Sequence, residues 1–162
     1  MKFFVSAFIV GVFLSASICS AENLCPWINK ATAFGVLGGS EEAATASVSE
    51  ISSTTCSFVY RDGDITRELR VTVELAKDPE QIFTAYKARC GGDASPLRAI
   101  GNEAVMCAAD QKGRGELVIG RVRVNVFTIS VSTSSGSDPS MSYEALRQKA
   151  GLVAEQVSGN LF

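Results

Sequence analysis

A run rich in β-branched residues between Gly101 and Thr133 constrains the fold of this chain most strongly. It reads GNEAVMCAADQKGRGELVIGRVRVNVFTISVST, and turn-forming residues interrupt it at 110–115 and again near Asn125. β-branched side chains fit a pleated, half-buried surface, and such interruptions are typical of turns between strands. The run therefore predicts the centre of a β-sheet, and no part of it resembles a reactive site.

The apolar positions change phase near the end of this run. They stand at even positions up to Val126 and at odd positions from Phe127 to Val131. One flat strand cannot keep both sets on one face, because successive side chains point to opposite sides. A turn at Val124-Asn125 or a bulge near Val126 resolves the conflict, and a continuous strand buried on both faces is the alternative.

The preceding half of the chain predicts a further hairpin and an edge strand. Residues 56–61 and 65–75 alternate apolar and polar positions on either side of the turn dipeptide Asp62-Gly63. This pattern indicates two antiparallel strands with one face in water. Weak alternation within residues 39–55 predicts a third strand, at the edge of the sheet.

Capping residues predict three helices. Each begins after a side chain suited to accept hydrogen bonds from free N–H groups, and each ends at glycine. The expected helices cover about 30–37 after Asn29, the residues from Pro79 to Gly91, and the residues after Ser142 as far as Ser158-Gly159. Gly151 inside the last helix suggests close packing of that helix on the sheet.

These elements follow each other in the order α-β-β-β-α-β-β-β-α. Strands joined by short turns pair antiparallel, so the sequence predicts an α+β fold with helices packed on a mostly antiparallel sheet.

The amino-terminal residues MKFFVSAFIVGVFLSASICSA are typical of a secretory signal peptide. One cation, Lys2, precedes a twelve-residue apolar run from Phe3 to Leu14, which is shorter than the roughly 20 residues that span a bilayer. We expect cleavage after Ala21. An uncleaved anchor and a lipid attached at Cys19 are the alternatives. Residues 22–162 then form a single domain without a transmembrane segment, in the periplasm or outside the cell.

The charge balance gives little support to a nucleic-acid partner. The chain has 15 basic and 17 acidic residues, and removal of Lys2 with the signal leaves 14 against 17. Nucleic-acid-binding domains usually present a dense basic face, and no cluster of Lys and Arg of that kind occurs here.

Four cysteines remain after residue 21, namely Cys25, Cys56, Cys90 and Cys107. An even number of cysteines in an exported chain indicates two disulfides, although four cysteines allow three pairings. We expect Cys25–Cys56 and Cys90–Cys107, because each bridge would tie the end of a helix to a nearby strand. A metal site is disfavoured, since the chain has no CxxC pair and no histidine.

Several of these features together resemble a family of small bacterial exported domains or lipoproteins of unknown function. They are an early Cys before a short helix, the sequence CSFVY at 56–60, the sequence IGNEAV at 100–105 and a final A-L-x-x-x-A helix. Some members of that group resemble the PsbP-like α/β/α sandwich. The resemblance implies the same fold, and it implies no catalytic residues because such domains have no agreed ones.

Catalysis is the least favoured function. Without histidine the commonest general base is missing, and no nucleotide-binding or nucleophile motif occurs. No cofactor is implied. The carboxylate pairs Glu41 with Glu42 and Glu103 with Asp110 leave a sugar hydrolase as a formal alternative, although adjacent glutamates on a polar loop usually belong to a solvated surface.

A non-catalytic binding or interaction domain is the favoured function. Its partner would be another envelope protein, a lipid or a cell-wall component. Arg61, Arg70, Arg121 and Arg123 could form an anion-recognising surface, although solvent-facing strand positions are polar by default. An inhibitor that presents the loop 110–115 to a foreign hydrolase is a further alternative.

Overall fold

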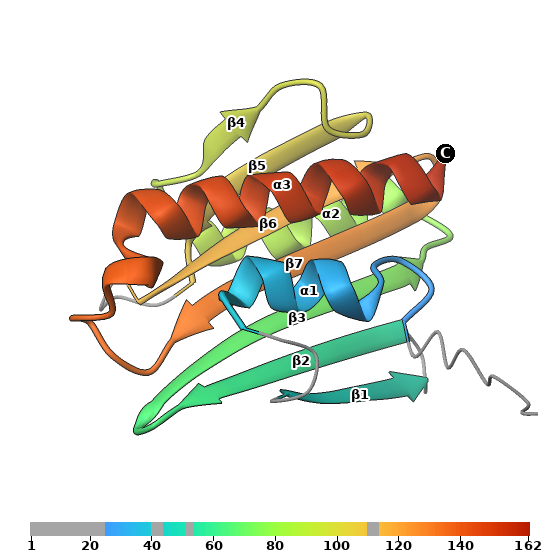
Figure 1. The fold of residues 1–162 in the computed structure, drawn as a ribbon. Helices are drawn as coiled ribbons and strands as arrows, with labels where there is room; N and C mark the ends of the chain where they lie inside the picture. The colour runs from blue at the N-terminus through green and yellow to red at the C-terminus, as the bar shows by residue number, and fades with distance from the viewer. Residues whose placement is uncertain (1–24, 40–43, 51–53, 110–113) are drawn as a thin grey trace, which may run out of the picture.

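A computed structural model of the chain describes residues 25–39, 44–50, 54–109 and 114–162 (Figure 1). These residues form one seven-stranded antiparallel sheet and three α-helices. The helices are α1 (Lys30–Leu37), α2 (Pro79–Lys87) and α3 (Tyr143–Leu161). The strands are β1 (Ala44–Glu50), β2 (Thr54–Asp62), β3 (Ile65–Leu75), β4 (Ser95–Leu97), β5 (Glu103–Ala108), β6 (Gly115–Val122) and β7 (Asn125–Thr133). The predicted α+β class is confirmed.

The strand order across the sheet is β1-β2-β3-β7-β6-β5-β4. Each half of the chain forms a meander of neighbouring strands, and the pairing of β3 with β7 joins the two halves. The edge strand predicted within 39–55 is therefore confirmed as β1. One short strand, β4, was not predicted, because Pro96 and only two other residues form it beside β5.

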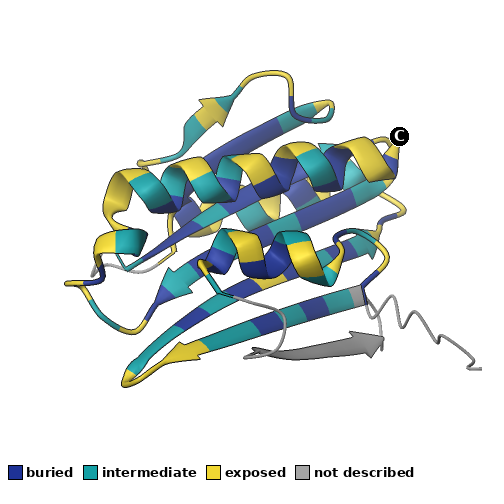
Figure 2. Cartoon of the chain, in the orientation of Figure 1, coloured by how far each residue is buried: buried dark blue, intermediate teal, exposed yellow. Residues whose placement is uncertain are grey.

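Helices cover both faces of the sheet. α1 and α3 pack on one face, whereas α2 lies behind it on the other (Figure 1). The larger apolar core lies under α1 and α3 and contains an edge-to-face pair, Phe34 of α1 and Phe58 of β2, with ring centroids 5.9 Å apart. The smaller core lies under α2 and includes Phe83, Ile119 and Val126. Figure 2 shows this burial along the inward sides of the helices.

The helices begin where the capping residues predicted. The side chains of Asn29, Asp78 and Ser142 each accept a hydrogen bond from a backbone N–H three residues later. An N-cap of this kind satisfies one of the free N–H groups of the first turn. Local sequence therefore fixed the starts of all three helices.

Both predicted hairpin turns occur, each one residue away from the expected dipeptide. In the β2–β3 hairpin, Asp62 pairs with Ile65, so Gly63 and Asp64 form the turn and Gly63 has a φ of +57°. In the β6–β7 hairpin, Val122 pairs with Asn125, which places Arg123 and Val124 in the turn. Arg123 has a φ of +52°. A tight hairpin needs positive φ at its first central residue, and here a bulky side chain adopts it.

The end of α3 differs from the prediction. The helix continues through Ser158 and Gly159 to Leu161, which is buried. Tertiary contacts stabilise this last turn, since Asn160 Nδ2 donates to the carbonyl of Trp27 at 2.9 Å. The expected close packing at Gly151 is wrong. An added methyl group there would meet only Met106 Cε, at an ordinary contact distance of 3.9 Å.

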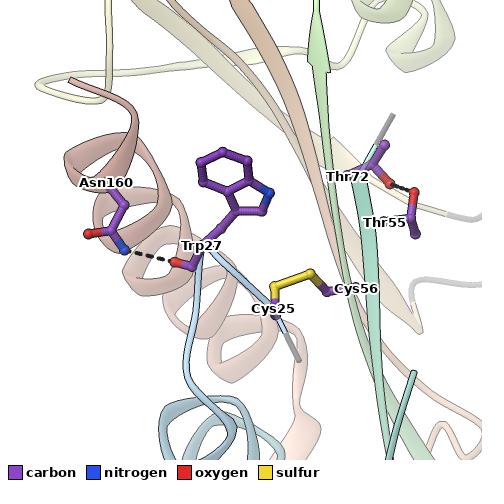
Figure 3. Close-up of a disulfide and its surroundings, with 6 residues drawn as sticks. All are labelled: Cys25, Trp27, Thr55, Cys56, Thr72 and Asn160. Atoms are coloured by element: carbon purple, nitrogen blue, oxygen red, sulfur yellow. Dashed lines mark hydrogen bonds between the residues drawn. A yellow bond between two sulfur atoms is a disulfide. The ribbon is translucent and has the colours of Figure 1, made fainter. Parts of the chain in front are cut away.

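Both predicted disulfides are confirmed. Cys25–Cys56 ties the segment before α1 to β2 within the larger core (Figure 3). Cys90–Cys107 ties the 3₁₀ turn after α2 to β5 within the smaller core. Each bridge thus fastens a helical segment to one face of the sheet.

The expected signal peptide, its cleavage site at Ala21 and the alternative lipid site at Cys19 lie outside the described residues. Within the described ranges, every helix is too short or too polar to span a bilayer.

Candidate functional site

A groove of about 760 Å³ runs beside α3 and reaches the β4–β5 hairpin. α3 packs mainly over β6 and β7, so the strands beyond them carry less helical cover. The helix contributes side chains spaced three and four residues apart, which share one face. The lining residues are Leu97, Met106, Tyr143, Glu144, Arg147, Gln148, Gly151, Leu152 and Glu155.

Two apolar side chains of α3 are exposed along this groove. Tyr143 is 59% exposed and Leu152 is 55% exposed, whereas the inward positions such as Leu146 and Val153 are buried. Isolated exposed apolar residues are common on proteins, but two on one groove form a surface suited to contact with another molecule. The groove therefore offers apolar contact area as well as charged groups.

A buried carboxylate lies close to this groove. Glu116 of β6 is 1% exposed, and its Oε2 atom has no hydrogen-bond partner among the described residues. The nearest cation is Arg147, whose Nη1 atom lies 3.6 Å from that oxygen. Burial raises the pKa of the Glu116 carboxyl, and the positive charge of Arg147 opposes this rise only in part.

Arg147 also belongs to the wall of the groove. Its Nη1 atom donates to the hydroxyl of Tyr143 at 3.1 Å, and its guanidinium carbon lies 5.5 Å from the centre of the Tyr143 ring. Tyr143 and Arg147 also line a second hollow of about 430 Å³, which includes residues 92–95 and 107–108. These two side chains are thus shared by both hollows, and Arg147 connects them to the buried carboxylate.

The four predicted arginines do not form one free cationic surface. Arg70 donates to Glu68 at 2.6 Å, and Arg121 donates to Glu103 at 2.9 Å. These two arginines lie on strands β3 and β6, which β7 separates. Arg61 is exposed near the end of β2, and Arg123 lies in the β6–β7 turn. Binding of an anion by these residues stays a prediction.

The predicted carboxylate pairs receive no geometric support. Glu103 is engaged by Arg121, while Glu41, Glu42 and Asp110 lie outside the described residues. Most of the predicted inhibitory loop, residues 110–113, lies outside them as well. Within the described ranges, no three His, Cys, Asp or Glu side chains are grouped closely enough to hold a metal ion.

The sequence did not predict a buried ion pair that joins three parts of the chain. Arg67 of β3 donates to both carboxylate oxygens of Asp138, at 2.7 and 3.0 Å, and to the carbonyl of Leu37 at 3.1 Å. Thr133 and Ser140 donate to the same carboxylate. Burial alone would raise the pKa of Asp138, but the hydrogen bonds from Arg67 and Ser140 and the charge of Arg67 hold it at about 2. This network stabilises the loop before α3.

A sequence signal for both buried charged residues existed. Arg67 stands in phase with the inward residues Leu69 and Val71 of β3, and Glu116 stands in phase with Val118 of β6. A charged residue in the apolar phase of a strand indicates a buried polar contact, because alternate side chains share a face.

No known protein family, characterised protein or solved structure matches this chain. The resemblance to small exported bacterial domains therefore stays an expectation, and the function is argued from the groove itself.

Proposed function

We propose that this protein is an exported, non-catalytic binding domain whose groove beside α3 holds an extended segment of a partner protein in the periplasm or outside the cell. The groove, with Tyr143 and Leu152 exposed along it, is the observation that carries this proposal. Exposed apolar groups flanked by charged ones are typical of surfaces that bind another protein.

Two features support export. The amino-terminal sequence is typical of a signal peptide, and disulfides persist mainly in oxidising compartments. The disulfides and the lack of a membrane-spanning helix in the described residues are compatible with a periplasmic or extracellular protein.

The side chains of the groove define the chemistry of the partner segment. Glu144 and Glu155 form no ion pair within the part of the chain that the structure describes, whereas Arg147 is already directed at Glu116. A segment with one apolar side chain for Tyr143 and Leu152 and a basic side chain for the two glutamates would satisfy these groups.

The absence of histidine supports a function without catalysis, because proton transfer near neutral pH most often uses imidazole. The buried carboxylate does not change this view. Glu116 is 1% exposed, so a substrate would not reach it without movement of α3.

Panning of a displayed random-peptide library on the purified protein tests the proposal. We expect enriched peptides that combine apolar and basic residues, and we expect the variant Tyr143→Ser/Leu152→Ser to bind them at least about tenfold more weakly. The variant Leu75→Ser removes a more exposed apolar side chain away from the groove and should bind them as the parent does. If no peptide is enriched, or if the groove variant binds as tightly as the parent, the proposal is wrong.

A further inference from the structure

A second group of exposed apolar side chains lies away from the groove. Of the five large hydrophobic residues that are exposed in the described part of the chain, Tyr143 and Leu152 border the groove. The other three are Leu75 at 75% exposure, Phe162 at 60% and Val124 at 50%. They come from the end of β3, the end of the chain and the β6–β7 turn, and we call them the apolar tip.

Printed contacts join the three parts of the apolar tip. The carbonyl of Val124 accepts from the N–H of Ala76 at 2.8 Å, next to Leu75. The guanidinium carbon of Arg123 lies 5.7 Å from the centre of the Phe162 ring. The carboxyl end of α3, the end of β3 and the start of β7 accordingly lie at one end of the molecule (Figure 1).

The only tryptophan of the chain lies at this same end. The carbonyl of Trp27 accepts from Asn160, two residues before Phe162, and the indole lies beside the last turn of α3, on the side of the sheet (Figure 3). Trp27 is half-buried, and its Nε1 atom has no hydrogen-bond partner among the described residues. Because Trp27 packs against the larger core and its Nε1 atom is itself buried, the indole belongs to the core next to the apolar tip and not to its exposed surface.

Two exposed cations lie in or next to the segments of the apolar tip, and a third lies in a connection that contacts the β6–β7 turn. Lys77 follows Ala76, Arg123 lies in the turn, and Arg98 belongs to the β4–β5 connection, in which Asn102 accepts from the N–H of Arg123 at 2.6 Å. Glu103 pairs with Arg121, whereas the exposed Asp78, next to Lys77, caps α2 through a backbone N–H and is the opposing charge nearest to Lys77 in the sequence.

We propose that the apolar tip inserts into the surface of an anionic lipid bilayer, with Lys77, Arg98 and Arg123 contacting lipid phosphates. A tip made from a turn, a strand end and the residue after α3 presents separate side chains that enter a soft interface independently. Apolar and aromatic residues bordered by cations are the combination that binds anionic membranes from one side. This surface is distinct from the groove and does not depend on the function proposed for it.

Flotation with lipid vesicles tests this proposal. The mature protein is purified and mixed with vesicles of phosphatidylglycerol and phosphatidylcholine in equal parts. We expect co-flotation, and we expect the variant Leu75→Ser/Val124→Ser/Phe162→Ser to partition at least about tenfold less, because three apolar side chains no longer enter the lipid. The variant Tyr143→Ser/Leu152→Ser is the matched control and should float as the parent does.

The lipid composition of the vesicles gives a second readout that does not require a variant. Weaker binding to pure phosphatidylcholine vesicles would support the role of the cations, whereas equal binding would overturn that role. If the parent fails to float, or if the tip variant floats equally well, the proposal is overturned.

Discussion

Asp138 and Glu116 are both buried carboxylates near an arginine, yet their environments differ. Asp138 accepts two hydrogen bonds from Arg67 and others from Thr133 and Ser140. Glu116 has one oxygen without a hydrogen bond, and its nearest cation lies 3.6 Å away. The pKa of Asp138 is accordingly lowered, whereas the pKa of Glu116 is raised. Hydrogen-bond geometry, rather than the presence of a cation, decides whether a buried charge stabilises this fold.

The arginines of the two pairs also differ in what they contact. Arg67 is 6% exposed and holds β3, α1 and the loop before α3 together. Arg147 is partly exposed, lines the groove and contacts Tyr143 as well as Glu116. The better-satisfied pair thus stabilises the fold, and the poorly satisfied one lies where we propose that a partner binds.

Removal of the Asp138 charge should give the largest effect on stability. In the variant Asp138→Asn, Arg67 stays buried without its counter-ion, so we expect the free energy of unfolding to fall by about 3–5 kcal/mol. Chemical denaturation followed by Trp27 fluorescence or circular dichroism measures this change. The control Asp93→Asn alters an exposed aspartate and should change stability by less than about 0.5 kcal/mol. A loss below about 1 kcal/mol for Asp138→Asn would contradict the structural role of the pair.

Low pH should weaken the network of Arg67 and Asp138 over a defined pH range. The pKa of Asp138 is about 2 in the folded protein against an ordinary 3.8, so its contribution is present above about pH 4 and is lost as the pH falls towards 2. The loss amounts to about 2–3 kcal/mol, since one pKa unit corresponds to about 1.4 kcal/mol. Denaturation measured at several pH values should show this slope in the parent and a shallower one in Asp138→Asn.

Contacts between residues close together in the sequence were predictable, whereas most contacts between distant residues were not. Asn29, Asp78 and Ser142 cap their helices through bonds to residues three positions away, so a short window contained the whole interaction. The disulfide pairing was predictable because each bridge joins a helix end to a strand. In contrast, Arg67 and Asp138 are 71 residues apart, and only the strand phase of Arg67 indicated that it is buried.

The groove was not predictable for a related reason. Its shape depends on where α3 crosses the sheet, which follows from packing between α3 and β6 and β7. In the sequence, Tyr143 and Arg147 only stand outside the apolar stripe of an amphipathic helix. The predicted arginines show the opposite case, since alternation correctly placed Arg70 and Arg121 on strands but did not indicate their acidic partners.

Replacement of Glu116 should change stability in the opposite direction from replacement of Asp138. A carboxyl whose folded pKa is raised supports stability at low pH, and this contribution is lost as the pH rises through the folded value. The variant Glu116→Gln removes the buried charge, so we expect unchanged or increased stability near neutral pH, by on the order of 1 kcal/mol. Thermal unfolding at neutral and mildly acidic pH measures it. A marked loss of stability at neutral pH would show that the Glu116–Arg147 contact is a stabilising ion pair.

Replacement of Arg147 should give the smallest effect on stability, and it should change the pKa of the Glu116 carboxyl. Its side chain is 31% exposed and 3.6 Å from the carboxylate, so Arg147→Gln should lower stability by less than about 1 kcal/mol. The pKa of Glu116 should rise further, because the positive charge that opposes the effect of burial is removed. NMR titration of the side-chain carboxyl carbon measures this pKa in both proteins. Arg89→Gln is a matched control, since Arg89 stacks on Tyr86 as Arg147 does on Tyr143 and should leave Glu116 unaffected. An unchanged or lower pKa in Arg147→Gln would mean that another group sets the charge of Glu116.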